Sequence, residues 1–336
     1  MKIIIKLSMD FPEIYRYENM KLFSSEGVIF KEVFYDPPIQ IFEVLNYDSP
    51  RLLQSIRYIV SRSTSIKRCL LVPNSLHDFL VEIRDFFNYG SFAVHVHRES
   101  STIRYDRNKD IDELVKLMRS VGYDEVSLKN PDIILAKLYC EDRNYTGVEL
   151  YPNKRRFVDR RPSKRPIFSP FSLEPKLARL LINLSGVPRN GIVIDPFCGV
   201  GGVPIEAAYI DVNSICVELK YKWARGAIRN IEYFLSGPQR CFYEIISGDS
   251  LDAFINVESM YLATDPPYGR ITSVSSIVDE VYRYLVSSFL RKVRGAAFFT
   301  DRDIGDILAD YRLSHIVRFT IPVHSSLTRF LYVTGV

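Results

Sequence analysis

The sequence predicts an α/β fold in which a mostly parallel sheet occupies the second half of the chain. From about residue 171 onward, strand and helix patterns alternate, which is typical of a parallel sheet that helices cover on both faces. Two strand patterns near the C-terminus, 315–323 and 329–335, have no helix between them, so we expect an antiparallel hairpin at one sheet edge. Before residue 150 the strands and helices are mixed without a regular order, which indicates a separate α+β region.

The first half contains five segments with a clear pattern. We expect, in chain order, a strand at the N-terminus, a helix over 10–27, a strand over 91–98, a helix over 108–122 and a strand over 132–139. In the helix over 108–122, apolar residues recur at helical spacing from Ile111 to Met118. Asn108 can cap the start of this helix, and Gly122 can end it.

The second half begins with a predicted helix over 172–186. Ser172 is its expected N-cap and Pro175 lies in its first turn, while leucines recur at helical spacing behind them. After this helix we expect strands at 191–197, 214–219, 243–249, 260–263 and 295–300, and helices at 203–209, 222–234 and 277–293.

The composition is that of an ordinary globular protein and excludes several classes. The chain has 336 residues, of which 47% are hydrophobic and 25% charged, and no apolar run approaches the ~18 residues of a membrane span. We expect no signal peptide, because no small-residue cleavage site follows the apolar start. The five cysteines are scattered and form no CxxC, which argues against disulfides and zinc and for a reducing, cytoplasmic compartment.

The five histidines form no metal-binding signature in the sequence. His95 and His97 can lie on one face of a strand, where we expect them to have a structural role. The sequence therefore predicts no bound metal.

Positive charge is concentrated in one short segment in the middle of the chain. Residues 151–186 hold nine basic and two acidic residues, net +7, whereas 1–150 carry net −2 and 187–336 net −1. Such a run is either a solvated linker or a strap that binds phosphate groups. Its candidate cations are Arg155, Arg156, Arg160, Arg161, Lys164 and Arg165.

A glycine-rich turn follows the first strand of the second half. The run VIDPFCGVGG places Asp195 and Pro196 at the end of a strand and then a turn that leads into a helix. Gly199 and Gly201 can adopt positive φ there and let a ligand approach the backbone. The run is not the GxGxxG fingerprint and lacks the P-loop lysine, and a carboxylate at Asp195 suits a cationic cofactor better than a phosphate.

Acidic residues also follow the next two strands. Glu218 ends the second strand, where an acid suits the two hydroxyls of a ribose. Asp249 and Ser250 follow the third strand, where the aspartate can accept a hydrogen bond from an adenine amine. Because open α/β sheets bind ligands at the carboxyl ends of their strands, we expect these acids to line one site.

The fourth strand ends in Asp265-Pro266-Pro267-Tyr268, a rigid bend, since proline fixes φ and cannot donate to a sheet ladder. With the glycine turn and the strand-end acids, this DPPY run resembles the class I S-adenosylmethionine-dependent methyltransferases and their Rossmann-like domain. Within that class it is similar to the amino-methyltransferases, which modify amines of nucleobases. A proline turn without a function is the alternative for the tetrapeptide taken alone.

The resemblance implies roles for these residues. Asp265 and the carbonyl of Pro266 would accept the N–H bonds of an exocyclic amine and free its lone pair. The ring of Tyr268 would stack against the target base after that base has flipped out of the nucleic acid. No metal is needed, because the sulfonium methyl group is already activated. The implied ligands of S-adenosyl-L-methionine are Asp195, Pro196, Gly199, Gly201, Glu218, Asp249, Ser250 and Asp265.

Further segments extend the resemblance over nearly the whole chain. Residues 168–186 look like the helix that closes over the methionine end of the cofactor in amino-methyltransferases. The run HSSLTRFLYV at 324–333 resembles the C-terminal signature of tRNA guanine-N2 methyltransferases. The N-terminal half is similar to the small N-terminal domain and the THUMP domain of those enzymes, which binds the acceptor end of tRNA. The combination resembles the archaeal family that methylates guanosine 10 of tRNA.

This resemblance implies four parts: an α+β domain over 1–50, a THUMP-like RNA-binding domain over 51–150, a basic linker over 151–170 and a Rossmann-like methyltransferase domain over 171–336. The expected partner is tRNA, met by the six basic residues named above, with no membrane or structural metal and with the chain as a monomer. The sequence leaves open whether one or two methyl groups are added and whether a small activator protein is required.

Three other functions remain open at this stage. A related THUMP family methylates guanosine 6 and typically has Asn where this chain has Asp265. DNA or RNA adenine-N6 and DNA cytosine-N4 methyltransferases share the DPPY run, although a THUMP-like region has no role on duplex DNA. An inactive RNA-binding protein with a vestigial cofactor fold is the non-enzyme alternative, which the intact acids and glycines disfavour.

Overall fold

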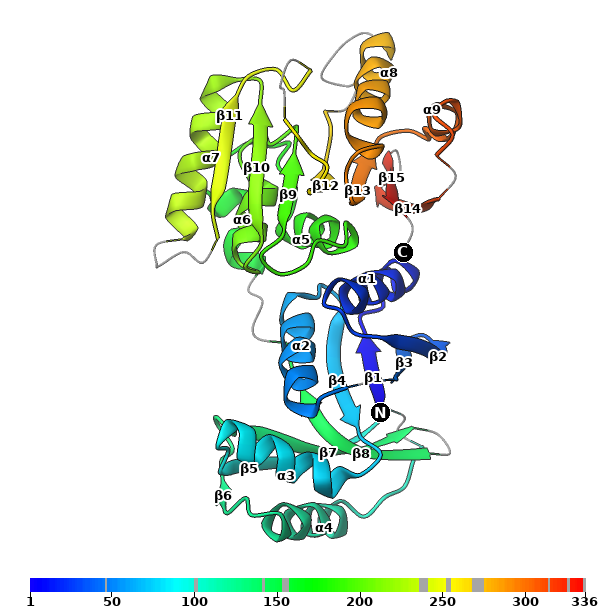
Figure 1. Ribbon diagram of the computed structural model, residues 1–336, viewed down its shortest axis with the longest axis vertical. Helices are drawn as coiled ribbons and strands as arrows, with labels where there is room; N and C mark the ends of the chain where they lie inside the picture. The colour runs from blue at the N-terminus through cyan, green and yellow to red at the C-terminus, as the bar shows by residue number, and fades with distance from the viewer. Residues whose placement is uncertain are drawn as a thin grey trace. The chain divides into compact units, whose positions relative to one another are not determined.

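The computed structural model describes residues 1–45, 47–99, 102–140, 143–152, 157–235, 241–251, 255–267, 275–313, 315–324 and 327–334. The chain divides into two compact units (Figure 1). The first comprises Met1–Arg16, Gly27–Ser61 and Ser65–Lys154, and the second comprises Tyr17–Glu26, Arg62–Thr64 and Arg155–Val336.

One sheet of eight strands organises the first unit, in the order β2-β3-β1-β4-β8-β7-β5-β6. The strands are β1 (Lys2–Leu7), β2 (Phe30–Asp36), β3 (Ile39–Val44), β4 (Ile66–Val72), β5 (Ser91–Arg98), β6 (Glu125–Val126), β7 (Ile133–Cys140) and β8 (Arg143–Leu150). The strands expected at the N-terminus, at 91–98 and at 132–139 are confirmed. Because β1 pairs with β4, residues 1–50 and 51–150 contribute to the same sheet.

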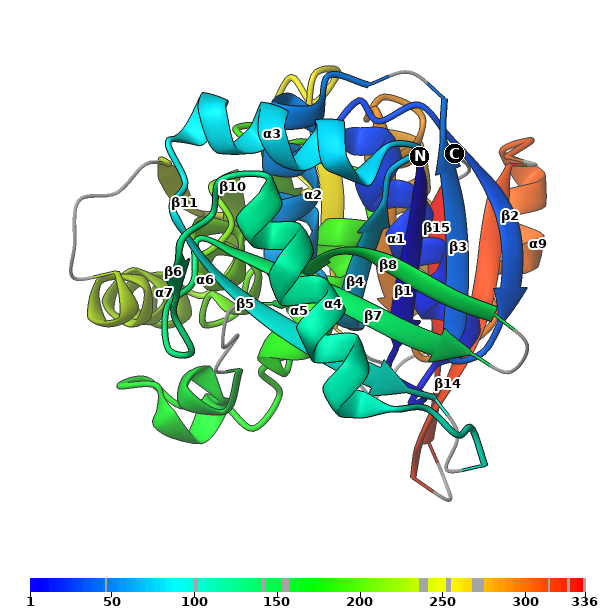
Figure 2. The ribbon, with the colours of Figure 1, turned by 90° about the horizontal axis from the view of Figure 1, so that it is seen from below.

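Helices α2 (Ser49–Arg62), α3 (Leu76–Phe87) and α4 (Arg107–Ser120) accompany this sheet, and α1 (Pro12–Ser25) contributes residues to both units. Figure 2 shows α4 lying across β5 and β7. The predicted cap of α4 is wrong by two residues, because the side chain of Asp106 accepts the backbone N–H of Lys109. Asp106 lies one residue before the helix, where a short acidic side chain reaches the free N–H groups, while Asn108 is already inside it. Gly122 follows this helix with φ of +86°.

A sheet of seven strands organises the second unit, in the order β11-β10-β9-β12-β13-β15-β14. Its strands are β9 (Ile192–Asp195), β10 (Asn213–Glu218), β11 (Tyr243–Ser247), β12 (Tyr261–Thr264), β13 (Gly295–Thr300), β14 (Ile316–His324) and β15 (Leu327–Thr334). The first five of these strands in chain order run parallel, and β15 and β14 are antiparallel. The predicted mostly parallel sheet with an antiparallel hairpin at one edge is confirmed.

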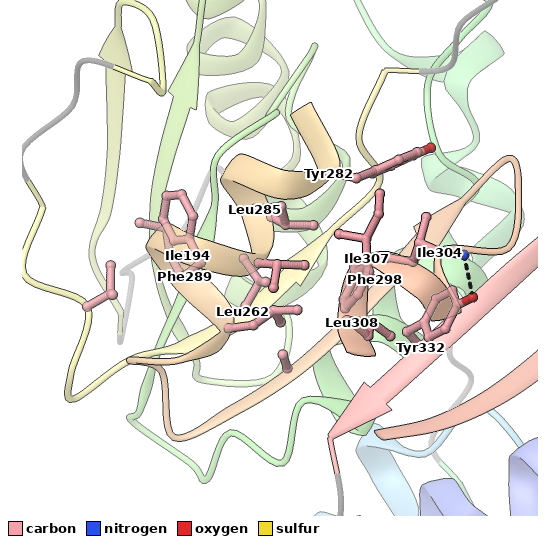
Figure 3. Close-up of a cluster of buried hydrophobic side chains, with 14 of the residues drawn as sticks. Ile194, Leu262, Tyr282, Leu285, Phe289, Phe298, Ile304, Ile307, Leu308 and Tyr332 are labelled. Carbon is pink, nitrogen blue, oxygen red and sulfur yellow. Dashed lines mark hydrogen bonds between the residues drawn. The ribbon is translucent and has the colours of Figure 1, made fainter. Parts of the chain in front are cut away.

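Helices cover both faces of this sheet. They are α5 (Pro175–Leu184), α6 (Gly202–Ala208), α7 (Tyr221–Phe234), α8 (Ser275–Tyr284), which continues as the π-helix η3 (Leu285–Leu290), and α9 (Gly305–Asp310), with 3₁₀ turns η1 (Phe157–Arg160) and η2 (Pro162–Lys164). On one face Cys216 of β10 packs with Ala227 of α7. On the other, Ile194 and Leu262 pack against α8, η3 and α9 (Figure 3).

The predicted N-cap of α5 is corrected by the structure. The helix begins at Pro175, three residues after Ser172, and Glu174 is the residue that precedes it. Glu174 has ψ of 141°, since the proline ring disfavours helical geometry in the residue before it, whereas proline itself is well placed at the first helical position. Ser172 is thereby left in the segment ahead of the helix.

One hydrophobic core of the second unit joins β9, β12 and β13 to the helices on one face. Figure 3 shows Tyr282, Leu285 and Phe289 on one side of this cluster and Ile304, Ile307 and Leu308 on another. The hydroxyl of Tyr332 accepts the backbone N–H of Ile304 at 2.9 Å, which ties β15 to the segment before α9. Because β9 to β13 pair in parallel, their carboxyl ends lie along one edge of the sheet.

No helix in the described part of the chain is long and apolar enough to cross a lipid bilayer.

Candidate active site

A cavity of about 1260 Å³ opens at the carboxyl ends of the parallel strands in the second unit. Asp195, Glu218, Asp249 and Asp265 all line it, after β9, β10, β11 and β12 respectively. The structure therefore brings together the four acids that the sequence placed at strand ends. Open parallel sheets bind their ligands in this location.

The glycine turn between β9 and α6 forms one wall of the cavity. Gly199 and Gly201 have φ of +56° and +86°, a region that side-chain-bearing residues rarely adopt. A Cβ on Gly201 would lie 3.2 Å from the Cβ of Ala227, so this glycine also permits α6 to approach α7. A Cβ on Gly199 would meet nothing within 4 Å, so the backbone there borders open space.

Glu218 connects the end of β10 to this turn. Its Oε2 accepts the backbone N–H of Gly199 at 2.8 Å, and its Oε1 accepts the backbone N–H of Lys220 at 2.9 Å. Each carboxylate oxygen has lone-pair capacity for a second donor. Glu218 is thus held in one orientation while it can still bind two hydroxyl groups.

Asp195 lies deeper than the other acids and is 3% exposed. Its Oδ1 accepts the hydroxyl of Thr264 at 2.6 Å and the backbone N–H of Phe197 at 3.1 Å. Burial raises the pKa of Asp195 to about 7, despite these two hydrogen bonds. The bond to Thr264 joins the end of β9 to the end of β12.

Asp249 and Ser250 follow β11. Asp249 is half-buried, and its Oδ1 accepts the backbone N–H of Leu251 at 2.9 Å. Ser250 is buried, and its carbonyl accepts the hydroxyl of Tyr284. The turn after β11 is therefore fixed both by its own aspartate and by α8.

Asp265, Pro266 and Pro267 continue β12 into the cavity, and Tyr268 lies outside the described residues. The Oδ2 of Asp265 is 3.6 Å from Nη1 of Arg329 on β15, and the two side chains are 12% and 17% exposed. Pro266 is buried and Pro267 exposed. The rigid bend thus presents a carboxylate that faces a guanidinium.

Arg329 and Asp301 were not singled out by the sequence, although both line the cavity. An arginine inside the otherwise apolar strand run RFLYV was a usable signal for Arg329. Asp301 follows β13, so the rule that located the other acids at strand ends also applies to it.

A model of the family described as "RMKL-like, methyltransferase domain" matches residues 162–323, which contain the glycine turn, Glu218 and the proline bend. The tRNA (guanine(10)-N2)-dimethyltransferase of Pyrococcus abyssi is 30% identical over 254 residues, which cover 73% of this chain and 74% of the relative. The chain belongs to the tRNA (guanine(10)-N2)-dimethyltransferase family.

Two further relatives show the extent of the family likeness. The dimethyltransferase of Methanothermobacter thermautotrophicus is 28% identical over 352 residues and covers 99% of both chains. The tRNA (guanine(10)-N(2))-methyltransferase TRMT11 of Gallus gallus is 28% identical over 211 residues, covering 54% of this chain and 45% of the relative.

Two residues of the basic segment, Arg160 and Arg165, do not have the phosphate-binding role that the sequence predicts. Arg160 is 4% exposed and donates from Nε to Glu206 at 2.6 Å, while Arg179 donates to the same buried carboxylate at 2.7 Å. Arg165 is 5% exposed and donates to the carbonyls of Arg160 and Leu173. Arg160 and Arg165 are therefore structural, because a phosphate cannot reach side chains that are buried and already bonded.

Two of the remaining cations of the segment, Arg161 and Lys164, are exposed. Arg161 makes a long contact of 4.0 Å with the exposed Glu174, an interaction that is weak in water. Arg155 and Arg156 lie outside the described residues. Of the six cations that the sequence predicts to bind RNA, Arg161 and Lys164 remain as candidates in the described part of the segment.

Proposed function

We propose that this chain transfers methyl groups from S-adenosyl-L-methionine to the exocyclic N2 of guanosine 10 in tRNA. The observation that carries the proposal is that Glu218 and Asp265 line one cavity, at the ends of β10 and β12. A ribose-binding acid and an amine-binding acid within one cavity are what a nucleobase amino-methyltransferase requires. Membership of the dimethyltransferase family supports tRNA as the substrate and position 10 as the target.

The residues of the cavity fit S-adenosyl-L-methionine. Glu218 would accept two ribose hydroxyls and Asp249 the adenine amine, and both line the cavity, where the backbone at Gly199 borders open space. The hydroxyl of Ser172 also lines the cavity, is buried and forms no hydrogen bond within the described residues. A buried hydroxyl without a partner is costly, and a polar group of the cofactor would satisfy it.

The cofactor supplies a methyl group on a sulfonium that is already activated for transfer. Asp265 and the carbonyl of Pro266 would accept the N–H bonds of the guanine amine, which favours the geometry that frees its lone pair. The two prolines fix these acceptors before the substrate arrives, so little conformational freedom is lost in binding. Arg329 lies beside Asp265 and would help to orient its carboxylate.

The first unit, as a THUMP-like region, and the exposed cations Arg161 and Lys164 would bind the tRNA through its phosphates. The function is tested by incubating the purified chain with tRNA and S-adenosyl-L-methionine and then digesting the tRNA to nucleosides. Mass spectrometry should detect N2-methylguanosine or N2,N2-dimethylguanosine. A methylated adenine or cytosine as the only product would contradict the proposal.

A further inference from the structure

Three side chains of the first unit converge on one face of its sheet. His95 and His97 lie on β5 and Glu149 on β8, with β7 between these strands. His95 pairs with Ala136 of β7, and Ala136 pairs with Gly147 of β8. Because these intervening residues are small, the imidazoles can reach across β7 to the carboxylate.

The other face of β7 is the one that α4 covers. Lys137, which alternates with Ala136 along the strand, donates to Asp110 of α4 at 2.6 Å. Figure 2 shows α4 over β5 and β7. The two histidines therefore face away from α4, and their side chains are 38% and 22% exposed. Solvent has access to both imidazoles.

The donor atoms of this cluster are spaced as in a metal site. Nδ1 of His95 lies 2.8 Å from Oε2 of Glu149, and Nε2 of His97 lies 3.1 Å from the same oxygen. The hydroxyl of Tyr151 lies 3.5 Å and 3.4 Å from these two nitrogens. Tetrahedral Zn²⁺ with bonds of 2.0–2.1 Å separates its ligand atoms by about 3.3 Å, so shifts of a few tenths of an ångström would suffice.

Glu149 is prepared for a cation. It is 2% exposed, and its Oε1 lies 2.8 Å from Nε of Arg68 and 3.0 Å from Nε2 of His97.

We propose that His95, His97 and Glu149 bind a divalent transition metal ion, with Zn²⁺ as the best match. Two imidazoles and a carboxylate are a known ligand set for this ion, and the hydroxyl of Tyr151 or a water completes four-coordination. The ion would join β5 to β8 across β7. The spacing of the sequence does not reveal this site, because 52 residues separate His97 from Glu149.

Arg68 on β4 competes with the metal. Its Nε lies 2.8 Å from Oε1 of Glu149, and its Nη2 lies 3.2 Å from Nδ1 of His97. A metal on Nε2 of His97 leaves the ring proton on Nδ1, where it would face an N–H of the guanidinium. Replacing Arg68 with glutamine removes the charge and offers an oxygen that can accept this proton, so metal binding should become tighter.

The test uses the full-length protein, stripped with a chelator and then titrated with Zn²⁺ by calorimetry and with Co²⁺ by visible absorption. We expect one ion per chain and the intense Co²⁺ bands of tetrahedral coordination. His95→Ala and Glu149→Gln should each weaken binding at least about ten-fold, and Arg68→Gln should strengthen it. His77→Ala is the matched control, since this histidine is 60% exposed on α3 and should not affect the titration.

Two results would overturn the proposal. One is the absence of a stoichiometric ion in both the parent protein and Arg68→Gln. The other is unchanged binding in His95→Ala, which would identify the ion as adventitious. Circular dichroism of each stripped variant shows whether it is folded; since His95 is partly exposed, its variant remains informative even if Glu149→Gln does not fold.

Discussion

Arg329 and Asp265 form an ion pair at the carboxyl end of β12, with Nη1 3.6 Å from Oδ2. The two residues come from different motifs of the sequence, the proline bend and the C-terminal strand run, which the antiparallel edge of the sheet brings together. The pair places an oriented carboxylate in the same cavity as Glu218. Under the proposed function, this arrangement would bring cofactor binding at Glu218 and amine binding at Asp265 into one site.

Asp265 should strongly affect the rate of methyl transfer and have little effect on the binding of cofactor and tRNA. Asp265→Ala should lower kcat by at least about 10²-fold while the affinities for the cofactor and tRNA stay near those of the parent, because the lost interaction matters most in the transition state. Asp265→Asn should keep part of the activity, since its carbonyl still accepts a hydrogen bond. Single-turnover assays beside binding isotherms separate these effects, and near-normal turnover of Asp265→Ala would exclude the mechanism.

Glu218 should control the affinity for the cofactor. Glu218→Ala removes the acceptor for both ribose hydroxyls and for the N–H groups of Gly199 and Lys220. Hydrogen bonds to a charged group contribute ~1.5–3 kcal/mol, so calorimetry should show the affinity for S-adenosyl-L-methionine falling about ten-fold or more. Glu244→Ala on β11, an exposed acid of the same size, is the control. Equal affinities in the two variants would remove Glu218 from the site.

Asp195 should make the stability of the protein without cofactor depend on pH. Burial raises its pKa to about 7, whereas in the unfolded chain the pKa is ~3.9. Between these values the folded state holds a proton that the unfolded state has lost, so stability falls as pH rises from about 4 to 7 and then levels off.

Asp195→Asn removes this titration and should raise the melting temperature relative to the parent at pH 8. The gain in unfolding free energy is at most about 4 kcal/mol, at ~1.36 kcal/mol per pKa unit, and the gap between the two proteins should close toward pH 4. Thermal melts across this range measure it. A difference that does not change with pH would mean that Asp195 is ionised in the folded protein.

Replacing Arg160 should destabilise the protein and replacing Arg161 should not, although the two residues are neighbours in the basic segment. Arg160→Ala removes one of the two arginines that bond the buried Glu206. Because Arg179 remains, the loss of stability should be at or below the ~3–5 kcal/mol typical of a buried charge left without a partner. Arg161→Ala alters an exposed side chain and should stay within ~0.5 kcal/mol of the parent. Chemical denaturation compares the two variants directly, and equal stabilities would contradict the buried ion pair.

The exposed cations should contribute to the salt dependence of tRNA binding. Each phosphate contact adds about 0.7–0.9 to the slope of log affinity against log salt. Replacing Arg161 and Lys164 together with alanine should therefore flatten that slope by about 1–2. If the slope is unchanged, the described part of the basic segment does not contact the RNA.

The sequence located the acids that line the cavity, but it did not distinguish buried from exposed arginines in the basic segment. Strand-end acids could be found because parallel strands share one edge, so a single rule located Asp195, Glu218, Asp249 and Asp265. The same charge pattern could not separate Arg160 from Arg161, since the partner that buries Arg160 lies 46 residues away at Glu206.

The first residues of two helices were also predicted wrongly from the sequence. Ser172 and Asn108 are good capping residues by type, but Pro175 determines where α5 begins and Asp106 reaches the N–H of Lys109 first. Local propensity identifies the element, and the competition between neighbouring residues decides its end. The cluster around Glu149 could not be predicted from the sequence, because Glu149 is brought close to His95 and His97 only by the pairing of β5, β7 and β8.

The central claim is that the cavity shared by Glu218 and Asp265 methylates N2 of guanosine 10. The most direct measurement follows methyl groups from labelled S-adenosyl-L-methionine into a tRNA transcript and into a matched transcript with adenosine at position 10, each digested and analysed by mass spectrometry. We predict labelled N2-methylguanosine or N2,N2-dimethylguanosine from the first transcript and none from the second. Equal labelling of the two transcripts, or label at guanosine 6 or in adenine, would contradict the account.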